Sequence, residues 1–275
     1  MDPYVWLAGS LVPFSEAKIG VTDLACLRGF GIYEGLAAHD GEPFHFHDHW
    51  LRFERSARAL GLALPYTEEE TLRAMRAVVR ANAPAGRALV RMILTGGRAD
   101  GTIVHVAGRE QLYLLAEPMR PFPSEWYTRG AHTITHAHKR PYPEFKTIHY
   151  IEAVLLQPKL AEACAAEAIY VSDGNVLECT GSNIFGVKDG ALVTPKDDML
   201  HGITRKVALE LAREAGLSVE ERALPLTELL TADEVFITSS FKDIVPVRSV
   251  DEHAIGNGEP GPVTQDLMGQ FRTLL

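Results

Sequence analysis

The chain has 275 residues, with 36 acidic side chains against 27 lysines and arginines, so its formal net charge is -9. Nucleic acid or an anionic membrane is therefore not expected as the main partner, because either would need a basic surface. Hydrophobic residues make up 46% and charged residues 23% of the chain, which is typical of a filled core and excludes extensive disorder.

Two helices and two strands are predicted in the first half of the chain. One helix follows Asp48, carries apolar residues at helical spacing and ends at Gly61. The other begins at Thr67, which forms a capping-box pattern with Glu70. Apolar runs over 88–94 and 111–115 predict the strands, and the prolines clustered between 118 and 123 predict a linker.

The second half is predicted to open with a strand at 133–135. Short strands follow over 168–193, with Asp-Gly turns at 173–174 and 189–190 that are a strong hairpin signal. A helix is expected from Thr204 to Gly216. Strands and helices mix without a regular βαβ rhythm, which predicts an α+β fold in two domains. The predicted boundaries are 1–117 and 128–275, with a linker over 118–127.

The cysteines and the N-terminal residues indicate the cellular compartment in which the protein is expected. Cys26, Cys164 and Cys179 form no C-x-x-C pair, so neither a disulfide framework nor a zinc site is expected. The first residues lack the pattern of a signal peptide, and no apolar run approaches the roughly 20 residues that span a bilayer. We therefore expect a cytoplasmic enzyme or small-molecule binder.

Two motifs suggest ligands but are better explained structurally. His45, His47 and His49 could share a strand face, but the third opens the predicted helix, so we expect no metal site. Gly29-Phe30-Gly31 lacks the third glycine of a dinucleotide loop, because Glu34 occupies its place. A tight turn with positive φ is the expected role of these glycines.

A lysine and a glutamate are candidates for covalent and acid–base chemistry. Lys146 lies between Phe145 and Ile148, which predict a half-buried strand end. Burial favours a neutral amine that can form a Schiff base, although most lysines are solvated surface charges. Glu178 follows apolar residues in a predicted strand. If its carboxylate is buried, a cofactor nitrogen would be a suitable partner. If it lies on the other face of the strand, it is exposed to solvent.

Two segments are suited to an anion. Gly202-Ile203-Thr204 opens a predicted helix, whose free N–H groups and positive end favour a phosphate. The turn Thr238-Ser239-Ser240 supplies hydroxyl groups for the same anion. Arg52 would add a cation, although its position off the apolar stripe of its helix predicts a surface arginine.

Together these segments resemble the class IV, or fold type IV, pyridoxal-phosphate enzymes. This family includes branched-chain aminotransferases, D-amino-acid aminotransferases and aminodeoxychorismate lyases. The resemblance implies a homodimer whose subunits have a smaller N-terminal α/β domain and a larger, β-barrel-like C-terminal domain with flanking helices. The blocks that carry it are 28–35, His49-x-x-Arg52-Phe53 with Ser56-Ala57, 146–150, 178–185, 200–205 and 236–247.

The resemblance also implies roles for individual residues. Lys146 would bind pyridoxal 5′-phosphate covalently and shuttle a proton, and Glu178 would pair with the pyridine nitrogen. Tyr150 would contact the ring oxygen, although His149 stands where the family usually has asparagine. The residues implied to bind the phosphate are Arg52, Ile203, Thr204, Ser239 and Ser240.

The motifs that separate the family's activities are incomplete here. Glu34 follows Tyr33 as in the aminotransferases, whereas the lyases carry threonine there. Thr95-Gly96-Gly97 lacks the arginine of the D-amino-acid enzymes, and Leu89-Val90-Arg91 lacks the tyrosine of the branched-chain enzymes. Arg91 and Arg28, with Tyr33 beside the substrate, would replace the usual carboxylate site.

The predicted function is a transaminase that moves an amino group between a small α-amino acid and a 2-oxo acid such as 2-oxoglutarate or pyruvate. D-amino acids are favoured, because the chain is short and the branched-chain tyrosine is missing. An L-branched-chain aminotransferase is the second hypothesis and the lyase the third. A histidine-based metal hydrolase or an inactive binding module is the hypothesis from another class.

Overall fold

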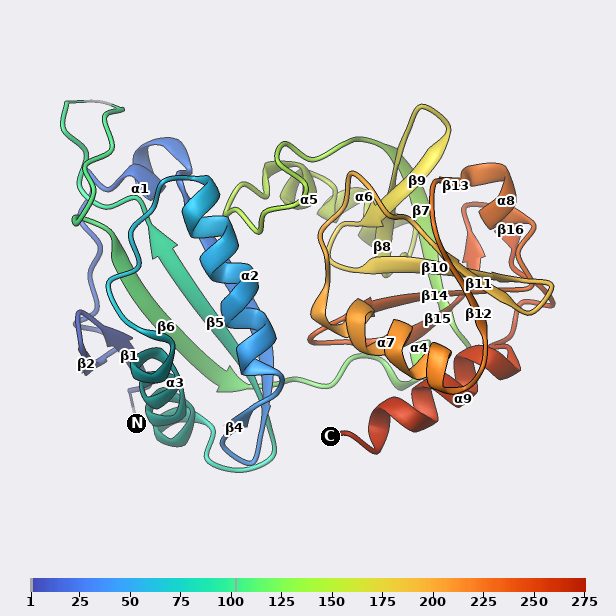
Figure 1. The fold of residues 1–275 in the computed structure, drawn as a ribbon, viewed down its shortest axis with the longest axis horizontal. Coiled ribbons are helices and arrows are strands. Elements are labelled where there is room, and N and C mark those ends of the chain that lie inside the picture. The colour runs from blue at the N-terminus through green and yellow to red at the C-terminus, as the bar shows by residue number, and fades with distance from the viewer. Residues whose placement is uncertain (1, 102) are drawn as a thin grey trace. The chain divides into compact units, whose positions relative to one another are not determined.

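The computed structural model describes residues 2–101 and 103–275 and divides into two compact units (Figure 1). Unit 1 comprises Met1–Arg120 and Phe145–Tyr150, and unit 2 comprises Pro121–Glu144 and Ile151–Leu275. The first change of unit falls inside the predicted linker. The segment Phe145–Tyr150 belongs to unit 1 although its neighbours on both sides belong to unit 2, which the predicted boundaries do not include.

Unit 1 is built on one antiparallel sheet with the strand order β2-β1-β6-β5-β3-β4. Its elements are β1 (Tyr4–Leu7), β2 (Ser10–Pro13), α1 (Leu24–Arg28), β3 (Gly31–His39), β4 (Glu42–Pro43), α2 (Phe46–Ala59), α3 (Glu68–Asn82), β5 (Arg87–Thr95) and β6 (Gln111–Pro118).

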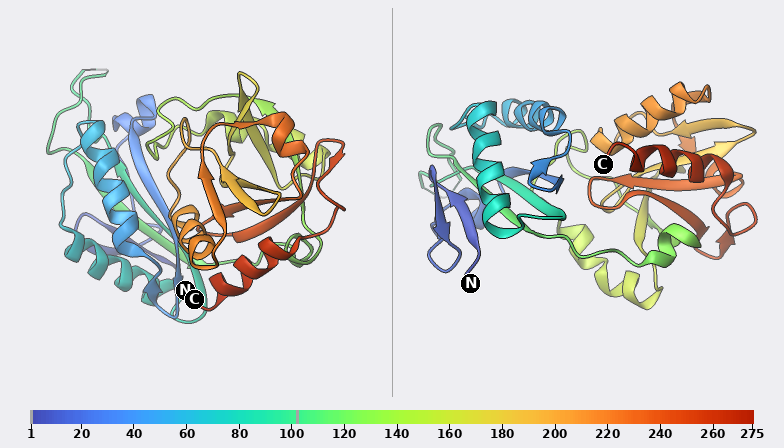
Figure 2. Two further views of the ribbon diagram at one scale, coloured as in Figure 1. Left: turned by 45° about the vertical axis from the view of Figure 1, so that its right-hand side comes forward. Right: turned by 90° about the horizontal axis from the view of Figure 1, so that it is seen from below.

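The helices α2 and α3 cover one face of this sheet (Figure 2). Leu36 of β3 and Val90 and Met92 of β5 point into this core and are fully buried. Because side chains alternate along a strand, Tyr33 and Arg91 point to the opposite face. At the start of α3, Thr67 and Glu70 form both hydrogen bonds of the predicted capping box.

Unit 2 is built on a curled, mixed sheet with the order β12-β11-β10-β14-β15-β7-β8-β9-β13, and β16 pairs with β15. Its strands are β7 (Ala131–Ala137), β8 (Glu167–Ser172), β9 (Asn175–Cys179), β10 (Asn183–Lys188), β11 (Ala191–Thr194), β12 (Ser218–Glu221), β13 (Leu224–Pro225), β14 (Glu234–Ser239), β15 (Asp243–Val250) and β16 (His253–Ala254). Its helices are α4 (Ser124–Thr128), α5 (Ile151–Leu155), α6 (Gln157–Glu162), α7 (Ile203–Glu214), α8 (Leu226–Leu230) and α9 (Pro262–Arg272).

The helices α7 and α9 pack on each other and against β14. Across the β10–β14 ladder, Phe185 stacks on Phe236, with ring centroids 4.7 Å apart. The acid Glu234 of β14 accepts hydrogen bonds from Val263 and Thr264 at the start of α9, so a strand side chain caps this helix. The α+β fold class predicted from the sequence is confirmed.

Within residues 2–101 and 103–275, no helix combines the length and the apolar content that crossing a bilayer requires.

Candidate active site

The segment that carries Lys146 is held by the first residues of β3. Tyr33 N donates to Lys146 O at 2.9 Å, and Ile148 N donates to Gly31 O at 3.1 Å. A Cβ on Gly31 would lie 2.7 Å from Leu94 O, so this glycine allows close packing rather than a turn. Gly29, by contrast, has φ +64° and ends α1 in the left-handed region, as the sequence predicts.

Three residues predicted to contact cofactor or substrate lie together in unit 1. The half-buried Lys146 places Nζ 4.6 Å from the centroid of the Tyr33 ring. Tyr33 in turn packs edge-to-face on Tyr150, with ring centroids 5.4 Å apart. The amine therefore lies in a partly apolar, aromatic environment on the face of the sheet that points away from α2 and α3.

Arg52 is buried, and the prediction of a surface position from helical periodicity is wrong. Its Nε and Nη2 donate to both oxygens of Glu34, at 2.8 and 2.7 Å, while His49 Nδ1 lies 2.7 Å from Glu34. None of the three side chains is more than 5% exposed. The buried carboxylate of β3 thus provides the compensation that allows a guanidinium on the inner face of α2.

The charge states in this network follow from its contacts. Burial raises the pKa of Glu34, but Arg52 and His49 outweigh burial and lower it to about 2. Burial lowers the pKa of His49 below its ordinary value, so its ring is neutral at pH 7. Because a carboxylate only accepts hydrogen bonds, Nδ1 of that neutral ring carries the proton.

The histidine run does not share a strand, contrary to the spacing argument for its first two members. His45 precedes α2 in a left-handed conformation, and His47 and His49 lie within the helix. Each ring contacts a different carboxylate: Asp48, Glu68 and Glu34 respectively.

The two arginines predicted to clamp a substrate carboxylate have separate partners. Arg91 lies across the strand pair from Gly35, on the same face as Tyr33, and its Nη1 donates to Glu117 at 2.8 Å. The Arg91 side chain is 42% exposed, so it can exchange this partner for a ligand. Arg28, in the last turn of α1, is exposed and donates to Leu27 O.

In unit 2, Glu178 is buried at 5% exposure, so it does not face solvent. Arg140 Nε donates to one of its oxygens at 2.6 Å, and Leu200 N donates to the other at 3.0 Å. Arg140 also donates to Pro143 O, so it fixes the chain a few residues before Lys146. Sequence reasoning missed Arg140, because nothing in its neighbourhood distinguishes it from a surface arginine.

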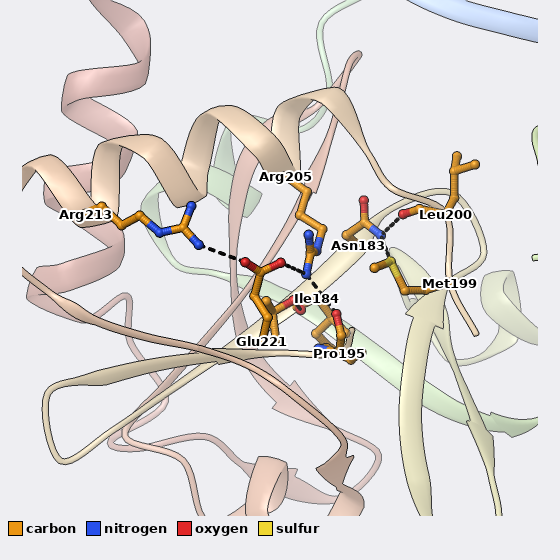
Figure 3. Close-up of polar contacts among 9 residues, drawn as sticks. Asn183, Ile184, Pro195, Met199, Leu200, Arg205, Arg213 and Glu221 are labelled. Atoms are coloured by element: carbon orange, nitrogen blue, oxygen red, sulfur yellow. Dashed lines mark hydrogen bonds and ion pairs between the residues drawn. The ribbon is translucent and has the colours of Figure 1, made fainter. Parts of the chain in front are cut away.

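The start of α7 is shaped by a glycine and by Asn183, which is labelled in Figure 3. Gly202 is the N-cap residue and makes no side-chain capping hydrogen bond. A Cβ at Gly202 would lie 2.0 Å from Asn183 Oδ1, so only glycine fits. Asn183 Nδ2 donates to Leu200 O at 2.6 Å, which anchors the chain that enters the helix. The N-terminus of α7 therefore offers backbone N–H groups and the positive end of a helix, which an anion prefers.

Hydroxyl groups lie on the strand beside this helix. Thr238 is opposite Asn183 in the β10–β14 ladder, and its buried Oγ1 has no hydrogen-bond partner among the described residues. Ser239, the last residue of β14, accepts a hydrogen bond from Lys242 N at 3.2 Å. An orphaned hydroxyl and a helix N-terminus in one unit fit an anionic group such as a phosphate.

Glu221 holds α7 on the sheet (Figure 3). One of its oxygens accepts from Arg205 Nη2 at 3.0 Å, and the other accepts from Arg213 Nη2 at 2.8 Å. Arg205 Nη2 also donates to Pro195 O, and burial lowers the pKa of Arg205. The two arginines and Glu221 therefore fix the orientation of the helix whose first residues form the anion site.

Comparison with known proteins gives one consistent family. The model of the family described as "Amino-transferase class IV" matches residues 31–250. A Methanocaldococcus jannaschii protein, provisionally assigned as a branched-chain-amino-acid aminotransferase, is 36% identical, and the match covers 98% of this chain and 96% of that one. The D-alanine aminotransferase of Bacillus licheniformis is 34% identical, with coverage of 94% and 92%.

Among solved structures, the branched-chain amino acid aminotransferase of Thermobaculum terrenum in its PLP-form superposes with a TM-score of 0.87. It is 28% identical, and the match covers 99% of this chain and 94% of that chain. Branched-chain aminotransferases predominate among both the relatives and the solved structures.

Proposed function

The chain belongs to the class IV aminotransferases, and from this premise we propose that it moves the amino group of a branched-chain L-amino acid onto a 2-oxo acid. The predominance of branched-chain enzymes among its relatives is the observation that carries this substrate class. It outweighs the motif argument for D-amino acids. The D-alanine aminotransferase relative keeps D-amino acids as the second candidate.

The cofactor of this family is pyridoxal 5′-phosphate, which when bound supplies an aldehyde for the amino group and a ring that accepts electrons. The residues of this chain fit such a group. Unit 1 offers a half-buried amine at Lys146. Unit 2 offers a buried carboxylate at Glu178 and the N-terminus of α7.

Lys146 would hold the aldehyde carbon through Nζ, with loss of water, and would be released when the substrate amino group takes its place. The freed Nζ is proposed to move a proton between the substrate Cα and the cofactor. A neutral amine is needed for both steps. The Tyr33 ring, 4.6 Å from Nζ, limits where the amine can point and so positions it for attack. Tyr150 packs on Tyr33 and is proposed to donate to the ring oxygen.

Glu178 is proposed to accept a hydrogen bond from the protonated ring nitrogen. Arg140 Nε and Leu200 N each occupy one carboxylate oxygen, which fixes the plane of the carboxylate. A carboxylate oxygen can accept more than one hydrogen bond, so the ring nitrogen can share an oxygen with one of these donors. An ionised carboxylate beside the ring nitrogen would keep the ring positive and able to withdraw electrons.

The phosphate is proposed to be bound by the backbone of Ile203 and Thr204, by Ser239 and Ser240, and by Arg52. The helix end supplies oriented N–H donors that need no rearrangement. Arg52 is held by Glu34, so its fork is oriented before any ligand arrives.

The substrate carboxylate is proposed to bind Arg91 and Arg28, with Tyr33 beside the reacting carbon. Arg91 lies on the same face of the sheet as Tyr33, because it pairs with Gly35, two residues further along β3. A long side chain spans this diagonal distance. A homodimer is proposed on the family resemblance.

A set of half-reactions tests the proposal. The cofactor-loaded protein is mixed separately with L-leucine, L-valine, D-alanine and D-glutamate, without a 2-oxo acid, and the visible absorbance is followed. Loss of the absorbance with L-leucine and L-valine, and its return on adding 2-oxoglutarate, is the expected result. Loss with the D-amino acids alone would establish the second candidate instead.

A further inference from the structure

A buried carboxylate in unit 2 joins two loops that no step above explains. Glu167, the first residue of β8, is 2% exposed. One of its oxygens accepts from Thr180 Oγ1 at 3.0 Å and from Gly181 N at 2.6 Å, and the other accepts from Ser182 Oγ. A single side chain thus organises the whole loop between β9 and β10.

The same carboxylate binds a lysine from a second loop. Lys242 Nζ lies 2.6 Å from Glu167 Oε1, and its side chain is only 14% exposed. Lys242 lies between β14 and β15, where its N donates to Ser239 Oγ and its carbonyl accepts from Tyr127 Oη. The lysine is therefore fixed at both its backbone and its amine.

These two loops lie at the same end of the sheet. The first loop leads directly into Asn183, the second follows Ser239, and Asn183 pairs with Thr238 in the β10–β14 ladder. Cys179 N also donates to Ser182 O, so the first loop is closed on itself. The Glu167–Lys242 pair spans the gap between the loops at the point where the ladder ends.

Glu167 retains its charge despite its burial. Burial raises its pKa, but Lys242, Ser182 and Gly181 outweigh burial and lower it below the ordinary value. The adjacent Cys179 shows the opposite effect, because burial and the charge of Glu167 raise the pKa of its thiol. The geometry of this link depends on both partners remaining in place.

We infer that Glu167 and Lys242 are positioning residues that hold the turn after Ser239 against the loop 180–182 and so fix that turn for the phosphate of the cofactor. This inference rests on the proposed function, which places Glu178 on the ring nitrogen and Ser239 and Ser240 on the phosphate. Neither Glu167 nor Lys242 touches the cofactor in this assignment. Their effect reaches it through the two loops.

The test compares pyridoxal 5′-phosphate with pyridoxal, which lacks the phosphate. Lys242→Met removes the charge but keeps the length of the side chain, and dissociation constants are measured on full-length protein freed of cofactor. We expect Lys242→Met to raise the dissociation constant of pyridoxal 5′-phosphate about tenfold and that of pyridoxal by less than about twofold. Glu167→Gln should also raise the dissociation constant of pyridoxal 5′-phosphate. The double variant should bind pyridoxal 5′-phosphate no more weakly than the weaker-binding single variant.

Lys188→Met is the matched control. Lys188 Nζ forms an ion pair with Asp233 at 3.2 Å in the same unit, but its side chain is 40% exposed. Its substitution should leave both dissociation constants unchanged. Should Lys242→Met not fold, Lys242→Gln keeps a hydrogen-bond donor without the charge. The same two dissociation constants are then measured for that variant.

Two results would overturn the inference. Unchanged affinity for pyridoxal 5′-phosphate would show that the pair does not position the turn. Equal weakening of both ligands would show a role in the fold alone. Failure of the unsubstituted protein to bind either aldehyde would instead contradict the proposed function, so the two failures are distinguishable.

Discussion

Glu34 is the residue on which the Arg52 site depends. Its carboxylate lies on the helix-covered face of β3 and is contacted by Arg52 and His49, both from α2. A carboxylate without these partners would be too costly to bury, and the arginine without the carboxylate would lose its orientation. The two residues therefore depend on each other, although they are 18 residues apart in sequence.

The charge of Glu34 predicts a defined pH dependence. Its pKa in the folded protein is about 2, below the ordinary 4.5, so its stabilising contribution is full above about pH 4.5 and is lost as the pH falls toward 2. We expect Glu34→Gln to lower the free energy of unfolding by about 3 kcal/mol at pH 7, and this deficit to shrink between pH 4.5 and 2. Urea unfolding at each pH measures it.

The exposed substitution Glu16→Gln is the control for this series and should follow the unsubstituted protein throughout. A deficit that stays constant down to pH 2 would mean that Glu34 carries no charge in the folded protein.

Arg91 allows a test of substrate binding at the level of one residue. If its guanidinium binds the substrate carboxylate, Arg91→Ala should raise KM for the amino acid about 10- to 100-fold, the equivalent of losing one or two charged hydrogen bonds. Steady-state kinetics with L-leucine measures the change. Glu117→Gln, which removes only the surface partner of Arg91, should leave KM within about twofold. Unchanged affinity in Arg91→Ala would refute the clamp.

Site residues that belong to local motifs are predictable from the sequence, whereas residues that depend on a partner from another element are not. Lys146, Tyr33 and Tyr150 were predicted from motifs and do lie together in unit 1. The position of Arg52 was predicted wrongly, because periodicity carries no information about a buried acid on another element. Arg140 was missed for the same reason, since its partner Glu178 lies 38 residues away in sequence.

Among the elements, α7 places the strictest requirement on one position, because its N-cap must be glycine. Because a Cβ at position 202 would lie 2.0 Å from Asn183 Oδ1, Gly202→Ala must displace the asparagine or the helix start. We expect a loss of about 1–3 kcal/mol in unfolding free energy together with weaker binding of pyridoxal 5′-phosphate. Thermal unfolding and cofactor titration measure the two effects.

Gly269→Ala provides the matched control within α9. A Cβ at that exposed helical position meets nothing within 4 Å, so this substitution should stabilise the protein by about 0.5–1 kcal/mol and leave cofactor binding unchanged. Equal behaviour of the two variants would show that the packing at Gly202 is not restrictive.

The elements themselves were predicted well where local signals are strong. The capping box of α3, the Asp-Gly turns that flank β9 and β10, and the buried runs of β5 and β6 all appear in the structure. The strand β3 was not predicted, because it contains two glycines and a buried glutamate and so lacks a regular alternation. Its identity depends on pairing with β5 and on partners from α2, which are tertiary effects.

At the scale of the whole molecule, the chain passes between the two units more often than the sequence indicates. The proline cluster marks the first passage, but nothing in the composition marks Phe145–Tyr150 as part of unit 1. Its assignment follows from two backbone hydrogen bonds to β3. A ligand that binds the folded protein and not the unfolded chain stabilises the fold, so bound cofactor should raise the free energy of unfolding.

Calorimetry tests this expectation. Pyridoxal 5′-phosphate at about 100 times its dissociation constant should stabilise the folded protein by about 2.7 kcal/mol and raise Tm on the order of 5–10 °C. The absence of a shift would contradict the assignment of these residues to the cofactor.

The covalent role of Lys146 is tested most directly by borohydride reduction of the cofactor-loaded protein followed by peptide mass mapping. The account predicts that the reduced cofactor is found on the peptide containing Lys146, and that Lys146→Ala is neither coloured nor labelled. Lys242→Met should still carry the label at Lys146. A label on another lysine, or a coloured and labelled Lys146→Ala protein, would contradict it.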